Sequence, residues 1–110
     1  MAGEPSFFEI GVPDAARARA FYAQVFEWTL HPMEGDQAWI ETPTARGGIH
    51  DGDEDCRIEL YFAVPDIEAA VGRVRAAGGE ASDPTSEEGF GSFSSCRDDQ
   101  GVRFGLHQAE

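Results

Sequence analysis

Residues capable of acid–base chemistry lie at alternating positions of four short segments of this chain. The segments are "FFEIGV", "GGIH", "RIELYFAV" and "VRFGLH". In an extended strand, residues two apart share a face. One face then collects two carboxylates, two imidazoles, a phenol and a guanidinium, from Glu9, His50, Glu59, Tyr61, Arg103 and His107.

This set of side chains is suited to proton transfer. A carboxylate in partly apolar surroundings can take a proton, while an arginine or histidine stabilises a developing oxyanion. Glu9 and Glu59 are therefore the candidate catalytic residues. The alternative is that the face is simply solvated, as one side of an antiparallel sheet often is.

The elements that must position these residues are repeated once. Residues 7–26, "FFEIGVPDAARARAFYAQVF", are echoed at residues 59–78 by "ELYFAVPDIEAAVGRVRAAG". Each stretch begins as an alternating strand and then reads Val-Pro-Asp. Because proline cannot continue a paired strand and aspartate suits a helix N-cap, Asp14 and Asp66 predict the start of a helix. Apolar residues at helical spacing follow each aspartate.

Three further strands are expected after each helix. They are "WTLHPM", "QAWIETP" and "RGGIH" in the first half, and "GEASDP", "FGSFSSC" and "VRFGLH" in the second, with "TSEEG" as a turn. The predicted fold class is α+β, with two βαβββ modules in tandem over residues 5–52 and 56–108. Together they form a single domain over residues 1–110.

Composition excludes several classes of function. The 110 residues carry a net charge of -13, which disfavours nucleic-acid binding and attracts cationic ligands. Every basic residue is arginine, so lysine Schiff-base chemistry is excluded. No apolar run could span a membrane and no secretory signal is present, so we expect a cytoplasmic protein. Cys56 and Cys96 lack metal or redox spacing and are expected to be free thiols.

Three stretches resemble the vicinal oxygen chelate superfamily, which includes glyoxalase I, extradiol dioxygenases and bleomycin-resistance proteins. They are "VPDAARARAFYAQVFEW", "FAVPDIEAAVGRVRAAGGE" and "RDDQGVRFGLHQ". The resemblance implies curled mixed sheets that enclose a cavity for a small organic molecule, commonly in a homodimer. The expected ligand-binding residues are Phe7, Trp39, His50, Tyr61, Phe93, Arg103 and His107.

The resemblance also indicates where a metal would bind. Metal-dependent members take ligands from the first and last strand of each module, at positions that correspond here to Phe7, Gly48, Glu59 and Gly105. Only Glu59 can coordinate, so the usual metal site is expected to be absent, and no cofactor is expected. The alternative is a displaced set, Glu9, His50, Glu59 and His107, which would suit zinc, nickel or iron.

Three functions stay open. The first is a glyoxalase-like protein of unassigned substrate that works without the usual metal. The second is a metal-dependent lyase, isomerase or dioxygenase that uses the displaced set. The third is an antibiotic-sequestering protein, similar to bleomycin-resistance proteins, that holds a flat cationic ligand between aromatic walls. Whether the protein is an enzyme is left undecided.

Overall fold

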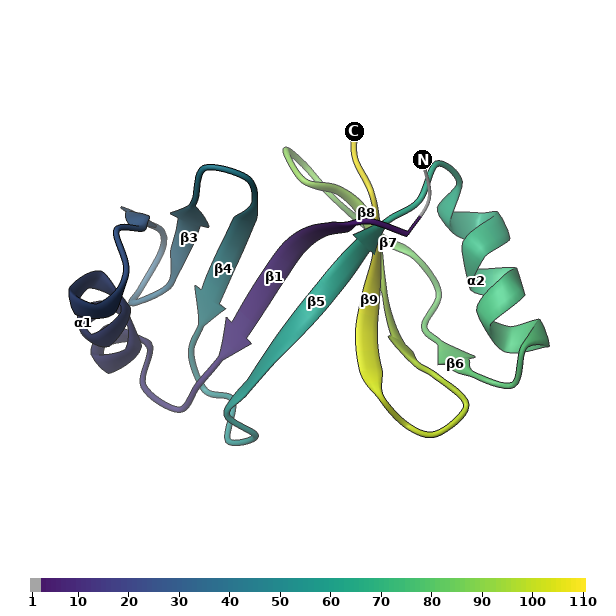
Figure 1. Cartoon of the computed structure of the whole chain (residues 1–110), viewed down its shortest axis with the longest axis horizontal. Coiled ribbons are helices and arrows are strands. Elements are labelled where there is room, and N and C mark those ends of the chain that lie inside the picture. Colours follow the sequence, from purple (N-terminus) through teal and green to yellow (C-terminus); the bar gives the residue numbers. More distant parts are fainter. Residues whose placement is uncertain (1–2) are drawn as a thin grey trace. The chain divides into compact units, whose positions relative to one another are not determined.

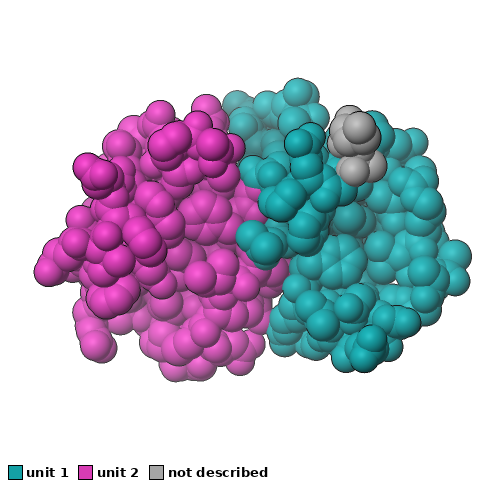
Figure 2. Space-filling model, viewed as in Figure 1, with its two compact units in different colours: residues 1–6, 60–110 teal, residues 7–59 magenta. Residues whose placement is uncertain are grey.

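The computed structural model describes residues 3–110, which divide into two compact units. Residues 7–59 form the unit that we call N-terminal, and residues 3–6 with 60–110 form the C-terminal unit (Figure 2). Within the described residues, neither helix has the length and apolar character needed to cross a membrane.

The N-terminal unit has the predicted strand–helix–three-strand order (Figure 1). Its elements are β1 (Pro5–Gly11), which enters the unit at Phe7, α1 (Ala15–Val25), β2 (Thr29–Pro32), β3 (Ala38–Glu41) and β4 (Arg46–His50). Strand β1 pairs in parallel with β4, and the antiparallel order β4–β3–β2 continues the sheet. The sheet is therefore mixed, as predicted.

The C-terminal unit repeats this plan with one extra strand. Its elements are β5 (Arg57–Ala63), which enters the unit at Leu60, α2 (Ile67–Ala76), β6 (Glu80–Ala81), β7 (Thr85–Glu87), β8 (Gly91–Arg97) and β9 (Arg103–Gln108). Strand β5 pairs in parallel with β9, β9 pairs antiparallel with β8, and both β6 and β7 pair with β8. The turn predicted at "TSEEG" is wrong in part, because Thr85–Glu87 pairs with Phe93–Gly91.

Both helices begin at the predicted N-caps. The Asp14 carboxylate accepts a hydrogen bond from the Arg17 backbone N–H at 3.1 Å, and Asp66 accepts one from Ala69 at 3.2 Å. Each bond satisfies one of the N–H groups that a first helical turn leaves without a partner. The repeated Val-Pro-Asp motif therefore fixes where each strand gives way to its helix.

Each helix covers one face of its own sheet with small and branched apolar residues. In the N-terminal unit the buried cluster is Ile10, Ala15, Ala18, Ile40 and Ile49, with Phe8 and Trp28 packed against it. In the C-terminal unit it is Ile67, Ala70, Val71, Cys96 and Leu106. The opposite face of each sheet is left for polar and aromatic side chains.

The alternation on β5 does not bury its first aliphatic residues. Ile58 and Leu60 are 60% and 45% exposed. Glu59, between them, is only 8% exposed. On this strand the acid lies on the more buried face, and the aliphatic residues lie on the more exposed one.

Candidate functional site

A row of chemistry-bearing side chains crosses the sheet of the N-terminal unit. The cross-strand pairs are His31 with Trp39, Trp39 with Gly48, and Gly48 with Glu9. Because directly paired residues share a face, all four lie on the side away from α1. The ring of His31 stacks on Trp39 with centroids 3.8 Å apart, and the Arg46 guanidinium lies 5.4 Å from the Trp39 ring centroid.

His50 at the end of β4 is held between two carboxylates. Its Nδ1 lies 2.7 Å from Oε2 of Glu9, and its Nε2 lies 3.3 Å from Oδ2 of Asp53. Val12 fixes this arrangement through the backbone, because it donates to the His50 carbonyl and accepts from the Asp53 N–H. The lack of a side chain on Gly11 leaves space for this contact. A Cβ there would lie 2.8 Å from the His50 Nε2 and would also clash with Asp53.

The two carboxylates change the protonation of this histidine. Burial lowers the pKa of His50, but the hydrogen bonds and charges of Glu9 and Asp53 outweigh it, and the net direction is upward from 6.5. The pKa of Asp53 is lowered, first by the hydrogen bond from the Asp55 backbone N–H and then by His50 and Arg57. Glu9 and His50 keep 24% and 34% of their side-chain surface exposed, so both are accessible to a ligand.

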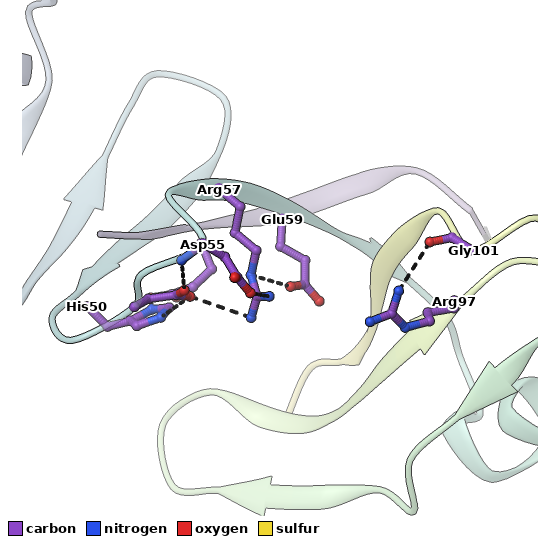
Figure 3. Close-up of polar contacts among 8 residues, drawn as sticks. His50, Asp55, Arg57, Glu59, Arg97 and Gly101 are labelled. Carbon is purple, nitrogen blue, oxygen red and sulfur yellow. Dashed lines mark hydrogen bonds and ion pairs between the residues drawn. The ribbon is translucent and has the colours of Figure 1, made fainter. Parts of the chain in front are cut away.

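The second candidate acid, Glu59, is engaged differently. Its carboxylate lies 3.4 Å from Nε of Arg57, whose Nη1 donates to Asp55 at 3.1 Å and whose Nη2 lies 3.5 Å from Asp53 (Figure 3). Burial lowers the pKa of Arg57, but the hydrogen bond to Asp55 and the charges of the three acids outweigh burial, and the net direction is upward. The Glu59 side chain is 10% exposed. Glu59 is therefore a largely buried carboxylate paired with a partly exposed arginine, whereas Glu9 is bonded to a histidine, which itself titrates.

The positions that carry metal ligands in metal-dependent members do not fit a metal ion here. Phe7, Gly48 and Gly105 have no donor side chain, and Glu59 is paired with Arg57. The space above each glycine is also filled: a Cβ on Gly48 would lie 2.6 Å from Oε1 of Glu9, and one on Gly105 would lie 2.7 Å from Cγ of Tyr61. Glu9 therefore lies over Gly48 and Tyr61 lies over Gly105, and these two glycines occupy corresponding positions on the last strand of each unit.

The displaced ligand set stays a prediction. Glu9 and His50 are bonded to each other, while His107 lies 2.7 Å through its Nε2 from the Phe90 carbonyl and 3.4 Å through its Nδ1 from the Ser6 hydroxyl. Across residues 3–110, no three histidine, cysteine, aspartate or glutamate side chains gather closely enough to hold an ion.

An aromatic cluster lies on the corresponding face of the C-terminal unit. His107 stacks on Phe90 with centroids 4.1 Å apart, and Phe90 meets Phe93 edge-on at 5.8 Å. Tyr61 lies 6.4 Å from each of these phenylalanines, with its ring above Gly105. The predicted ligand-binding residues Tyr61, Phe93 and His107 are thus brought together, and Arg103 lies on the same strand as His107.

Sequence reasoning missed several members of these groups. His31 had a signal, because it alternates with the apolar Leu30 in "WTLHPM" and so lies on the face away from the core. Asp53 and Phe90 had none, since they lie in irregular segments whose partners are set by the fold. Arg97 also escaped notice, although the register places it directly opposite Arg103.

Comparison with known proteins identifies the family. The family model described as a glyoxalase-like domain matches residues 7–107. The chain therefore belongs to the glyoxalase-like domain family, and the predicted membership of the vicinal oxygen chelate superfamily is confirmed.

Individual relatives differ widely in their described roles. The anthracycline biosynthesis protein DnrV of Streptomyces peucetius is 28% identical over 127 residues, covering 94% of this chain and 46% of that protein. The chain thus spans about half the length of this curated relative. Methylmalonyl-CoA epimerase from Mycobacterium tuberculosis superposes with a TM-score of 0.75 at 19% identity, over 97% of this chain and 88% of that one.

A third similarity is to a larger protein. A variant of homoprotocatechuate 2,3-dioxygenase from B. fuscum gives a TM-score of 0.71 at 16% identity, over 98% of this chain and 33% of that chain. At these identities the structural neighbours establish the fold alone, and they confirm the predicted α+β class.

Proposed function

We propose that this glyoxalase-like domain binds a small organic molecule and transfers a proton on it through Glu9, without the usual metal site. The observation that carries the proposal is the contact of 2.7 Å between Glu9 and His50, with Asp53 on the far side of the imidazole. Asp53 fixes the orientation of the ring, so His50 presents one nitrogen to the carboxylate. Both Glu9 and His50 are accessible, whereas Glu59 is largely buried against Arg57.

The chemistry that fits this arrangement is proton abstraction next to a carbonyl group. Glu9 accepts the proton from the carbon, the electron pair of the broken C–H bond passes into the ligand as an enolate, and the reverse step returns a proton to carbon. When it is charged, His50 stabilises the ionised form of Glu9 before the transfer. The name of the epimerase neighbour is consistent with chemistry at a carbon–hydrogen bond, although that likeness concerns the fold alone.

A second candidate function is binding without turnover. The aromatic cluster of Tyr61, Phe90, Phe93 and His107 favours it, because such rings hold flat ligands. The relative DnrV is described as an anthracycline biosynthesis protein, which is consistent with this second candidate. Sequestration of an antibiotic, as in bleomycin-resistance proteins, belongs to this second candidate.

Solvent exchange tests the proton transfer directly. The protein in heavy water is mixed with a panel of thioesters and 2-oxo acids that have an acidic C–H, and loss of the C–H signal is followed by proton NMR. We expect at least one compound to exchange faster than in buffer, and Glu9→Gln to reduce that rate about a hundredfold or more. His50→Gln should reduce it less, because the carboxylate remains.

The chain offers a matched control in its other histidine–glutamate pair. Nε2 of His31 lies 2.9 Å from Oε1 of Glu41, on an exposed part of the same unit. Glu41→Gln should exchange as the wild type does. Exchange that survives Glu9→Gln would exclude Glu9 as the base, while tight binding with no exchange of any compound would favour the second candidate.

We also propose, from the resemblance, that the protein acts as a homodimer. Sedimentation equilibrium should give twice the mass of a single chain. A single-chain mass at all concentrations would contradict this.

A further inference from the structure

Ser6 and His107 meet within the C-terminal unit, although they lie at opposite ends of the chain. Just before Ser6, the Ala63 N–H on β5 donates to the Glu4 carbonyl at 2.8 Å, which fixes the start of β1 beside β5. Ala63 in turn pairs with His107 on β9. This pairing brings the Ser6 Oγ to 3.4 Å from Nδ1 of His107.

The contacts of His107 decide which of its nitrogens can accept a proton. Nε2 lies 2.7 Å from the Phe90 carbonyl, and because a carbonyl only accepts, this nitrogen carries the hydrogen. In the neutral ring Nδ1 is then the acceptor, and Nδ1 is the nitrogen that faces the Ser6 hydroxyl. The Ser6 Oγ also lies 3.4 Å from the Tyr61 carbonyl, so the hydroxyl is held between two acceptors. A hydroxyl, a base and a group that orients the base are therefore in the order that activates a serine nucleophile.

The surroundings of His107 favour the charge that it would gain with the serine proton. Its ring stacks on Phe90 with centroids 4.1 Å apart and planes inclined by 16°, and the face of an aromatic ring attracts a cation. The hydrogen bond from Nε2 to the Phe90 carbonyl also strengthens when the imidazole is charged. A backbone carbonyl stabilises this charge less than the carboxylate of a full catalytic triad does. We therefore expect only esters with a good leaving group to be cleaved.

Aromatic rings border the serine and the histidine. Phe90 meets Phe93 edge-on at 5.8 Å, and Tyr61 lies 6.4 Å from each of these two rings. All three residues are half-buried, so part of their apolar surface faces solvent and can be covered by a flat ring. An aromatic alcohol also leaves an ester readily, because a phenol has a pKa of about 10.

We propose that Ser6 and His107 form a nucleophilic pair that cleaves esters of aromatic alcohols. The Ser6 Oγ attacks the carbonyl carbon of the ester while its proton passes to Nδ1 of His107. The bond between that carbon and the aryl oxygen then breaks, and the aryl oxide takes the proton from Nδ1. Water, which gives a proton to His107, hydrolyses the acyl-serine to a carboxylic acid, and the Ser6 hydroxyl is restored. This activity goes beyond the proton transfer proposed for Glu9 and uses other residues.

Hydrolysis of 2-naphthyl acetate by the full chain tests the proposal, with release of naphthol followed by fluorescence. We expect a rate about a hundredfold above that in buffer. Trifluoroethyl acetate, whose alcohol is activated but not aromatic, should be accelerated about tenfold less. Ser6→Ala and His107→Gln should each reduce naphthyl ester hydrolysis to the buffer rate. Ser6→Cys should still form the acyl-enzyme, because a thiol is also a nucleophile.

Two matched variants distinguish this pair from a general reaction of serines or histidines with activated esters. Ser86→Ala removes an exposed hydroxyl that lies 3.0 Å from the hydroxyl of Ser92. His31→Gln removes an imidazole from the N-terminal unit. Both variants should hydrolyse the naphthyl ester as the wild type does.

Labelling with a fluorophosphonate gives a readout that does not depend on turnover, because this reagent reacts with activated serines. Mass spectrometry of the digested protein should locate the phosphonate on Ser6 in the wild type and not in His107→Gln. If a variant does not fold, the labelled residue in the wild type decides. Hydrolysis that persists in Ser6→Ala, an equal loss in His31→Gln, or a wild-type protein without phosphonate on Ser6 would each overturn the proposal. Ester hydrolysis and solvent exchange are separate measurements, so this proposal can fail while the proton transfer by Glu9 stands.

Discussion

The substitution Gly48→Ala tests whether Glu9 is positioned by the glycine beneath it. The new Cβ would lie 2.6 Å from Oε1 of Glu9 and 3.2 Å from both Cδ and Oε2. A carbon and an oxygen in ordinary contact are about 3.4 Å apart, so the carboxylate must move by about 0.8 Å. The Oε2–Nδ1 distance of 2.7 Å to His50 then reaches the limit of a hydrogen bond.

The expected change in the free energy of unfolding follows from the loss of that hydrogen bond. A charge-assisted hydrogen bond contributes about 1.5–3 kcal/mol when it is well shielded. Because both side chains are partly exposed, we expect the free energy of unfolding to fall by about 1 kcal/mol at pH values where His50 is charged. The pKa of His50 should fall at the same time, since its first charged partner is moved away.

The assay is an NMR titration of the histidine rings, together with urea unfolding at about pH 6. If the pKa of His50 in Gly48→Ala equals that of the wild type, then Glu9 does not set the protonation of His50. The proposed role of the pair would fail with it.

Three further predictions concern stability. The raised pKa of His50 contributes stability that is fully present below about pH 6.5 and is lost as pH rises through the folded-state pKa; His50→Gln should remove this dependence from urea midpoints. Cys56 has φ of 51° in the left-handed region, so Cys56→Gly should raise the free energy of unfolding by about 0.5 kcal/mol, whereas Cys56→Ala should give no gain. Asp66→Ala removes the N-cap of α2 and should cost about 1 kcal/mol in thermal or urea unfolding, with Asp66→Asn close to wild type. A wild-type midpoint in Asp66→Ala would contradict the capping argument.

The features that depend on residues close together in the sequence could be predicted from the sequence. The Val-Pro-Asp motif placed both helix starts correctly, because proline and an aspartate cap act within one turn. Alternation also placed Glu9 and His50 on one face, and the parallel pairing of β1 with β4 then brought them into contact.

Features that depend on distant pairing could not be predicted in this way. Whether Thr85–Glu87 is a turn or a strand depends on β8, to which it pairs, and "TSEEG" has no apolar alternation that would indicate a strand. The opposition of Arg97 and Arg103 is a matter of hairpin register, which the intervening loop sets. The exposure of Ile58 and Leu60 reflects which part of β5 a helix reaches, and alternation carries no information on that.

The two covered glycines have a consequence for protein engineering. Gly48 and Gly105 each form the floor beneath one side chain, Glu9 in one module and Tyr61 in the other. Neither side chain belongs to the buried cluster of its unit. Residues 9 and 61 can therefore be diversified as two separate libraries on one scaffold, and each library changes the functional group above a glycine while the helix-covered core stays the same.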